Sequence, residues 1–400
     1  MLPTIFQEAI PLIKRIEEAG FQAYFVGGSV RDYLLGRPIN DVDIATSAFP
    51  DEIKSIFPRT ADIGIQHGTV LVIEPFGEYE ITTFRTESEY RDFRRPDQVE
   101  FIRSLEGDLK RRDFTMNSLA MDADGVMYDP FQGQADIKQR IIRTVGAPSD
   151  RFSEDALRML RGIRFVSQLG FDMEPATRNA LKLNENLLTH IAVERKTMEF
   201  EKMMGGEYKD LAIHLLLQSC LFKQLPGLAD KRNTMEKIAD FPLLKCLSKD
   251  QTWLLLLACI EERPAEFLKE WKLPSKMIKE RTKEKQILSI RTKEGWTKEL
   301  LYQSGLQRAN NVEKVYNCLH SISPSSIGKL KDEFESLPIK SREELNVTGR
   351  DLMQWTGRKG GPWIKEVLGN IEMAILHGEV RNEHEMIRRW IETCSPSEKN

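Results

Sequence analysis

The stretch FVGGSVRDYLLGRPINDVDIAT, residues 25–46, decides the fold of the N-terminal part of the chain. A short apolar run leads into Gly27-Gly28, and a short helix is expected from Ser29 to near Gly36. Paired glycines carry no Cβ, so backbone N–H groups there can approach a phosphate closely. Arg31, in the first helical turn, can add a charge-assisted hydrogen bond to the same phosphate. The pattern predicts a strand, a glycine turn and a helix that bind a nucleotide through Gly28 and Arg31.

The same stretch ends in a pair of carboxylates, Asp41 and Asp43, which we expect to lie on a β-strand. Residues two apart on a strand face the same side, so both carboxylates would point one way, with Val42 and Ile44 in the core. Two such carboxylates repel each other unless a cation lies between them, and Mg²⁺ bound to triphosphate oxygens is the usual cation. A tight turn followed by a solvated strand end is the alternative. The glycine turn and the carboxylate pair together favour a metal and nucleotide site.

Two regimes are visible along the chain. Strand-like runs separated by glycine and proline fill the region from residue 20 to 145, at residues 23–26, 42–45, 68–73 and 79–84. From Asp150 onward, apolar residues recur every three or four positions, and helices are expected at 153–170, 175–185, 193–204, 208–218, 251–260, 310–320 and 364–376. The predicted fold class is α+β, with a small mixed β-sheet followed by an all-helical remainder. Glu80, in one of the strand-like runs, is a candidate third carboxylate of the metal site, and a surface cross-strand partner is the alternative.

The composition excludes several classes of protein. The net charge is −3, so binding to nucleic acid requires a local basic face. Charged residues interrupt the N-terminal helix as they would not in a signal peptide, and the most apolar run, Trp253–Ile260, is too short to span a bilayer. The five cysteines have no CxxC spacing, and the six histidines have no metal-ligand spacing. We therefore predict a cytoplasmic protein without a membrane-bound part.

A second basic motif, RRDFTMN, spans residues 111–117. Two adjacent arginines beside a polar turn suit a triphosphate and ribose cradle, with Arg112 as the nucleotide ligand, and a capped basic helix start is the alternative. Before it, residues 84–101 have the composition of a mobile loop between two strands, with a solvated hairpin tip as the alternative. That loop carries Arg85, Arg91, Arg94 and Arg95.

The run FSEDALRMLRGIRF, residues 152–165, predicts a helix with Ser153 as its N-cap. Asp155 and Arg158 would then lie side by side on one face, and a salt-bridged surface helix is the alternative. Cytosine and adenine each present an amino donor beside a ring-nitrogen acceptor, which matches one carboxylate and one guanidinium. Uracil and guanine present the opposite pattern, so both contacts would be left unpaired.

These segments resemble the motifs of the polymerase-β nucleotidyltransferase superfamily, in the form found in class II tRNA nucleotidyltransferases. The resemblance implies that Asp41 and Asp43 hold the catalytic metal ions and that Asp155 and Arg158 act as an amino-acid template. It also implies nucleotide contacts for further arginines of the same helix, Arg161 and Arg164. Residues 193–199 resemble a motif that braces the preceding helix, and the loop at 84–101 resembles one that accompanies addition of the final A.

The resemblance implies a particular activity and domain organisation. The activity is template-independent addition of C, C and A to the 3′ end of tRNA from CTP and ATP, with release of pyrophosphate. It would use Mg²⁺ and one site for both nucleotides, with no obligate protein partner. The implied domains are a catalytic head (1–150), a neck that recognises the base (151–205), a body (206–325) and a tRNA-binding tail (326–400).

Four other functions stay open at this point. A bacterial poly(A) polymerase shares the motifs, but such enzymes usually carry a basic GRRF-like run, which residues 61–72 lack. An enzyme that stops after CC would lack the arginine-containing loop, which this chain contains. A non-catalytic RNA-binding protein or a triphosphate-binding regulator would bind its ligand without releasing pyrophosphate.

Overall fold

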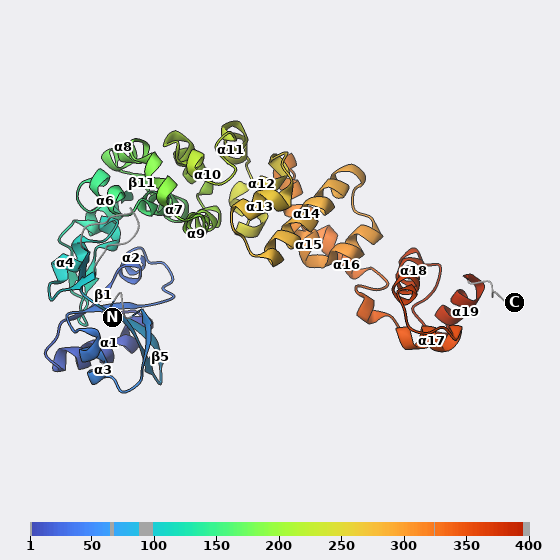
Figure 1. Ribbon diagram of the computed structural model, residues 1–400, viewed down its shortest axis with the longest axis horizontal. Coiled ribbons are helices and arrows are strands. Elements are labelled where there is room, and N and C mark those ends of the chain that lie inside the picture. Colours follow the sequence, from blue (N-terminus) through green and yellow to red (C-terminus); the bar gives the residue numbers. More distant parts are fainter. Residues whose placement is uncertain (1, 65–67, 88–98, 324, 395–400) are drawn as a thin grey trace. The chain divides into compact units, whose positions relative to one another are not determined.

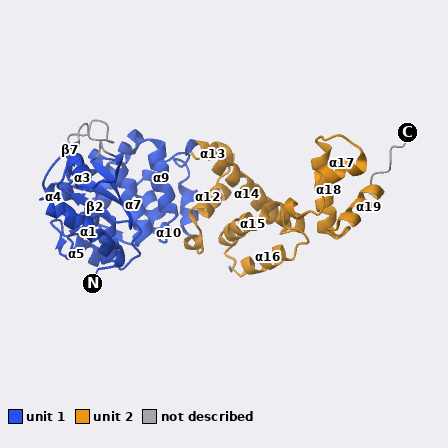
Figure 2. Cartoon of the chain, turned by 90° about the horizontal axis from the view of Figure 1, so that it is seen from below, with its two compact units in different colours: residues 1–240, 270–272 blue, residues 241–269, 273–400 orange. Residues whose placement is uncertain are grey.

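The computed structural model describes residues 2–64, 68–87, 99–323 and 325–394 (Figure 1). The chain forms two compact units, one of residues 1–240 with 270–272 and one of residues 241–269 with 273–400 (Figure 2). All β-strands of the described residues lie in the first unit, and the described part of the second unit is helical. The predicted α+β class is thus confirmed. The division into head, neck, body and tail stays a prediction.

A seven-stranded sheet forms the centre of the N-terminal region, in the order β3-β4-β5-β2-β1-β8-β9. Its neighbours are antiparallel except β2 and β5, which are parallel, so the sheet is mixed as predicted. Separate two-stranded sheets pair β6 with β7 and β10 with β11. The strands are β1 (Ala23–Val26), β2 (Asp43–Thr46), β3 (Thr60–Gly64), β4 (Thr69–Glu74), β5 (Gly77–Thr83), β6 (Arg85–Glu87), β7 (Val99–Phe101), β8 (Ala120–Met121), β9 (Met127–Tyr128), β10 (Ile141–Ile142) and β11 (Asp172–Met173).

Helices cover this sheet and continue beyond it within the first unit. In α1, the buried residues Phe6, Ala9, Leu12, Ile13 and Ile16 recur every three or four positions, so one face packs into the core. The helices of this unit are α1 (Thr4–Glu18), α2 (Gly28–Leu34), α3 (Pro50–Ile56), α4 (Leu105–Lys110), α5 (Gly133–Gln139), α6 (Pro148–Glu154), α7 (Leu157–Leu169), α8 (Pro175–Leu183), α9 (Val193–Met204), α10 (Lys209–Gln218) and α11 (Arg232–Ala239). The 3-10 helix η2 (Thr115–Asn117) connects α4 to β8.

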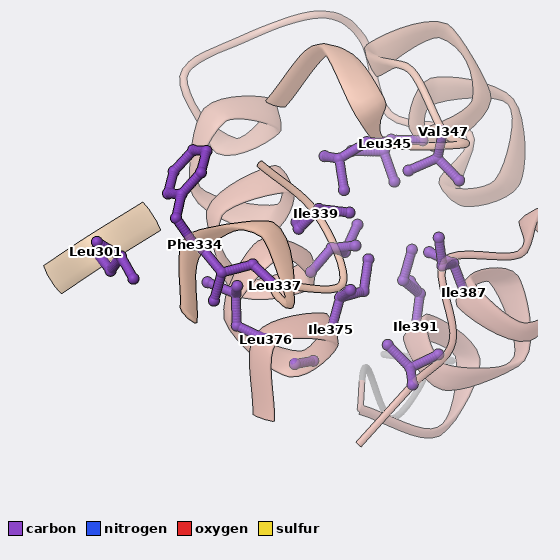
Figure 3. Packing of buried hydrophobic residues seen from close by; sticks show 14 of the residues in the cluster. Leu301, Phe334, Leu337, Ile339, Leu345, Val347, Ile375, Leu376, Ile387 and Ile391 are labelled. Atoms are coloured by element: carbon purple, nitrogen blue, oxygen red, sulfur yellow. The ribbon is translucent and has the colours of Figure 1, made fainter. Parts of the chain in front are cut away.

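The second unit is built from the helices α12 (Lys249–Cys259), α13 (Pro264–Glu270, whose last residue belongs to the first unit), α14 (Ser275–Glu294), α15 (Lys298–His320), α16 (Ser326–Glu335), α17 (Gly349–Thr356), α18 (Trp363–His377) and α19 (His384–Cys394). Gly305 interrupts α15 with a φ of 68°. Side chains of α15 to α19 and of the connecting segments converge in one apolar core, which includes Leu301, Phe334, Ile375 and Ile387 (Figure 3). The C-terminal helices thus share one buried core.

No helix in the described parts of the chain is long and apolar enough to cross a membrane.

Candidate active site

The glycine turn lies between β1 and α2. Gly27 has a φ of 69°, a conformation that side chains disfavour, and a Cβ on it would lie 3.0 Å from Nη1 of Arg112. The hydroxyl of Ser29 donates a hydrogen bond of 3.0 Å to the carbonyl of Val26 and closes the turn. Gly28 begins α2, and Arg31 follows one turn later. Glycine at position 27 therefore allows Arg112 to lie against the turn.

The two predicted metal-binding carboxylates lie beside this turn. Asp43 is the first residue of β2, but Asp41 lies before the strand, so the prediction that both lie on it was wrong. The reason is that β1 ends where the glycine turn begins, which leaves Asp41 without a strand partner. The expected alternation holds, since Val42 and Ile44 are buried and both aspartates reach solvent. Partial burial raises the pKa of Asp43 above its usual value. The charge of Arg112 lowers this pKa, and the charge of Asp41 raises it further.

A buried aspartate fixes the two adjacent arginines. Asp108, on α4, has a side chain only 1% exposed. One of its oxygens accepts hydrogen bonds from Arg111 at 2.7 and 2.9 Å, and the other accepts from Arg112 at 2.9 Å. Burial alone would raise the pKa of Asp108, but the two arginines hold it below its usual range. Asp108 is therefore ionised and fixes both guanidinium groups.

Asp113 connects the arginines of two different helices. Its side chain accepts hydrogen bonds from Nε of Arg161 at 2.8 Å and from the amide of Asn117 at 3.0 Å. The oxygen of that amide accepts from Arg31 at 2.8 Å. Burial opposes ionisation, but Arg161 and Asn117 lower the pKa of Asp113 to about 2. A continuous polar chain thus runs from α2 to α7.

The helix predicted at 153–170 is in fact two helices, α6 and α7. Ser153 lies inside α6, so its predicted N-cap role was wrong. Asp155 interrupts the helix with extended backbone angles (φ −137°, ψ 104°), and its Oδ1 accepts a hydrogen bond of 3.0 Å from the backbone N–H of Leu157. An aspartate often competes for backbone N–H groups in this way, and here it ends α6 and accepts from the first N–H group of α7.

Asp155 and Arg158 each have partners of their own. Arg195 of α9 donates to both oxygens of Asp155, at 2.8 and 3.4 Å. Arg158 is buried, lies 2.5 Å from Glu154 and donates to the carbonyl of Arg111 at 2.9 Å. Both side chains of the predicted base-reading pair are therefore held in place by neighbouring residues.

The helix α9 also holds the second half of α7. Glu199 is buried and forms an ion pair of 2.6 Å with Nε of Arg164. Burial lowers the pKa of Arg164, and the carboxylate of Glu199 counteracts this. These contacts support the predicted bracing role of residues 193–199.

One pocket of about 490 Å³ brings these groups together. Seven arginines and three aspartates line it, which gives the lining a formal charge of +4. The lining residues are Gly27, Gly28, Arg31, Asp43, Arg111, Arg112, Asp113, Asn117, Asp155, Leu157, Arg158, Arg161, Arg164, Phe165 and Arg195. A strongly positive pocket beside free carboxylates suits a triphosphate with a bound cation.

Most residues predicted from the sequence meet in this pocket. Those that line it are Gly28, Arg31, Asp43, Arg112, Asp155, Arg158, Arg161 and Arg164. Asp41 is not among the lining residues. The prediction left out Phe165, named Arg111, Asp113 and Asn117 only as parts of the 111–117 motif, and gave Arg195 a bracing role within 193–199 but no place in the pocket. The 111–117 motif marked Arg111, Asp113 and Asn117 as candidates, whereas placing Arg195 in the pocket required knowledge of how α9 packs.

The geometry does not test the predictions for Glu80, the candidate third carboxylate, and for the arginines of the loop at 84–101. Ile44 of β2 pairs with Ile81 of the parallel strand β5. Asp43 and Glu80, each one residue earlier, therefore lie on neighbouring strands at adjacent positions. In the described ranges, however, no three acidic, histidine or cysteine side chains are gathered as metal ligands. Of the loop arginines, Arg85 lies on β6, and Arg91, Arg94 and Arg95 lie outside the described residues.

Models of three domain families match the chain. The poly A polymerase head domain matches residues 23–143, and a probable RNA and SrmB-binding site of polymerase A matches 170–232. A putative second domain of tRNA nucleotidyltransferases matches residues 244–391. Fold, site and domain matches together define a nucleotidyltransferase that acts in RNA metabolism.

Relatives of the whole chain define the family. The CCA-adding enzyme of Geobacillus sp. (strain WCH70) is 50% identical over 390 residues, with 96% of both chains covered. That of Bacillus cereus (strain 03BB102) is 48% identical, with 98% of this chain and 99% of the relative covered. The crystal structure of the Bacillus stearothermophilus CCA-adding enzyme in complex with CTP is 46% identical, covers 98% of both chains and superposes with a TM-score of 0.89. The chain belongs to the CCA-adding enzymes, a family of tRNA nucleotidyltransferases.

Proposed function

We propose that this enzyme adds C, C and A to the 3′ end of tRNA from CTP and ATP without a nucleic-acid template. One observation carries the proposal: a single pocket is lined both by Asp43, a predicted metal-binding carboxylate, and by Asp155 and Arg158, the pair predicted to read the base. In the reaction, the tRNA 3′-oxygen attacks the α-phosphate in line. The new O–P bond forms as the bond to the β-phosphate oxygen breaks, the hydroxyl loses its proton, and pyrophosphate leaves.

Asp41 and Asp43 fit the divalent cation on which enzymes of this superfamily generally depend. Both carboxylates reach solvent, and their mutual repulsion contributes to the raised pKa of Asp43. Hard oxygen donors of this kind suit Mg²⁺. Bound there, Mg²⁺ would lower the pKa of the attacking hydroxyl and balance charge on the leaving pyrophosphate. We propose Glu80, on the neighbouring strand, as a further carboxylate of this site.

The arginines of the pocket would bind the triphosphate. Arg112 is held by Asp108, Arg161 by Asp113, and Arg164 by Glu199, so their guanidinium groups are oriented before the nucleotide arrives. Arg31 and Gly28, which also line the pocket, would bind further phosphate oxygens. Preorientation reduces the entropy lost on binding and keeps the α-phosphate in line with the attacking oxygen.

Asp155 and Arg158 would select the base. Arg195 and the Leu157 N–H already donate to Asp155, but a carboxylate has about four acceptor positions and can still accept from a base amino group. Arg158 would donate to the ring nitrogen of cytosine or adenine. Uracil or guanine would place a carbonyl oxygen against Asp155 and an N–H group against Arg158, and each such mismatched contact costs about 1–3 kcal/mol.

The tRNA and the compartment complete the proposal. On the predicted tail, Arg350, Arg358 and Lys359 are exposed, as phosphate-binding side chains must be. Thr348 and Asp351 form a capping box there, so these two residues also explain the start of α17. The cytoplasm remains the predicted compartment, and no obligate protein partner is expected.

The proposal is tested by sequencing the 3′ ends made from a tRNA that ends at the discriminator base. We expect CCA and no further addition with CTP and ATP, and CC alone with CTP. A ladder of A residues would indicate a poly(A) polymerase, and arrest at CC with both nucleotides would indicate a partial enzyme. Nucleotide binding without pyrophosphate release would indicate a regulator or a binding protein.

A further inference from the structure

One aromatic ring in the pocket is surrounded by three guanidinium groups. The central carbon of Arg164 lies 4.2 Å from the ring centroid of Phe165, that of Arg31 lies 5.2 Å away, and that of Arg161 lies 5.9 Å away. The ring is only 4% exposed, and Phe114 packs against it edge-on at 5.8 Å. Arg31 comes from α2 in the head, whereas the other two arginines come from α7.

Three like charges around one ring require something to hold them together. Each arginine has a carboxylate partner: Asp32 for Arg31, Asp113 for Arg161 and Glu199 for Arg164. Asp113 and Glu199 each attract both Arg161 and Arg164, whereas Arg31 is paired with Asp32. The negative face of the phenyl ring attracts cations, and all three arginines lie within 5.9 Å of its centroid.

We infer that Phe165 is a positioning residue, whose ring holds Arg31, Arg161 and Arg164 as one array for the nucleotide's phosphates. The inference rests on the proposed function, in which these arginines bind the triphosphate. Phe165 contributes no bond to the reacting atoms. Its effect therefore falls on the affinity for phosphate, equally for CTP and ATP, and not on the choice of base.

The test replaces Phe165 in the full-length enzyme with mono-, di- and trifluorinated phenylalanine. Fluorine withdraws electrons from the face of the ring and nearly preserves its shape, so a purely structural role would hardly be affected. We expect log KM for CTP and ATP to rise steadily with the number of fluorines, up to about tenfold, with kcat and base choice unchanged. The simpler variant Phe165→Leu is expected to raise KM by a similar factor.

Phe57 provides a matched control. It is 1% exposed and has Arg15 over its ring at 4.8 Å, but it does not line the pocket. The same fluorinated series at position 57 is expected to leave KM unchanged. A KM that is constant across the Phe165 series, or a change in base choice with it, would overturn the inference.

Calorimetric titration with inorganic tripolyphosphate separates this inference from the proposed function. Tripolyphosphate has no base and needs no transfer reaction, so it reports only on the phosphate-binding array. We expect its affinity to fall in step with fluorination at position 165. An enzyme that fails to make CCA but shows this fall would refute the proposed function and keep the role of Phe165. If wild-type protein does not bind tripolyphosphate, the inference is wrong.

Discussion

The two sides of the pocket, which we name after the predicted domains, differ in how their functional groups are held: β1, α2 and β2 form the head side, and residues 155–165 with Arg195 form the neck side. On the head side, Asp43 lines the pocket and Asp41 lies beside the glycine turn. Both reach solvent, and within the described residues neither has an ion-pair partner closer than 4.0 Å. On the neck side, Asp155 is paired with Arg195, and Arg158 with Glu154. The carboxylates of the head side are thus accessible to solvent, whereas Asp155 and Arg158 are held by ion pairs.

This difference follows from what each side must do. A cation site gains affinity when its carboxylates are not already neutralised by arginines. A base-reading site gains selectivity when its donor and acceptor cannot turn to satisfy the wrong base. We therefore expect substitutions on the head side to remove catalysis, and substitutions on the neck side to reduce selectivity.

The largest effect is expected from removing charge on the head side. Asp43→Asn keeps the shape of the side chain but weakens the cation site, and we expect kcat for transfer to fall at least about a thousandfold. Single-turnover kinetics with CTP measure this, and tRNA binding by filter retention should stay within about twofold. Asp62→Asn is the control, because Asp62 forms an exposed ion pair with Lys54 on the same domain. Transfer by Asp43→Asn near the wild-type rate would remove the metal assignment.

The polar chain that joins the two sides should matter for stability. In Asp113→Asn, Arg161 loses its buried partner, and we expect the free energy of unfolding of the first unit to fall by about 3 kcal/mol. Hydrogen exchange of amides in β1 and α7 measures this loss. Unchanged protection would show that the chain does not connect the two elements energetically.

The same residue predicts a pH dependence. The pKa of Asp113 is lowered to about 2 in the folded protein from 3.8, so its stabilisation is complete above pH 3.8 and lost as the pH falls toward 2. The stabilisation amounts to about 2–3 kcal/mol, since each pKa unit corresponds to about 1.4 kcal/mol. Between pH 5 and 2, Asp113→Asn should therefore lose less stability than wild type. Parallel pH profiles for the two proteins would contradict this.

The smallest of these effects is expected at Arg195. Arg195→Ala frees Asp155 to rotate, and we expect discrimination against UTP to fall about tenfold with little change in kcat for CTP. Incorporation of single nucleotides into tRNA ending in C measures this ratio. Glu194→Gln, at an exposed neighbour on α9 that pairs with Lys272, should leave the ratio unchanged. Equal discrimination in both variants would indicate that Asp155 needs no support from α9.

The sequence predicted the head side more completely than the neck side. Glycine turns and alternating strands are local patterns, so β1, α2 and the burial of Val42 and Ile44 could be read directly. The start of strand β2 could not be predicted, because it depends on where its partner β1 ends.

The structure of the predicted neck depends on contacts that no local sequence pattern reveals. The helical period of 153–170 was correct for α7, but α6 ends at Asp155, whose side chain accepts a hydrogen bond from the first residue of α7. The partners of the residues predicted to read the base come from distant positions, such as Arg195, forty residues away from Asp155. The clustering of three arginines around Phe165 likewise depends on the packing of α2 against the neck.

The most direct test compares base choice in Asp155→Ala and Asp43→Asn. The kcat/KM values for CTP, ATP, UTP and GTP are measured with the same tRNA primers for both variants and the wild type. We predict that Asp155→Ala loses most of its discrimination against UTP and GTP, and that the residual activity of Asp43→Asn keeps the wild-type preference. An Asp155→Ala enzyme that is slower but still discriminates as wild type does would contradict the division of the pocket into a catalytic and a base-reading side.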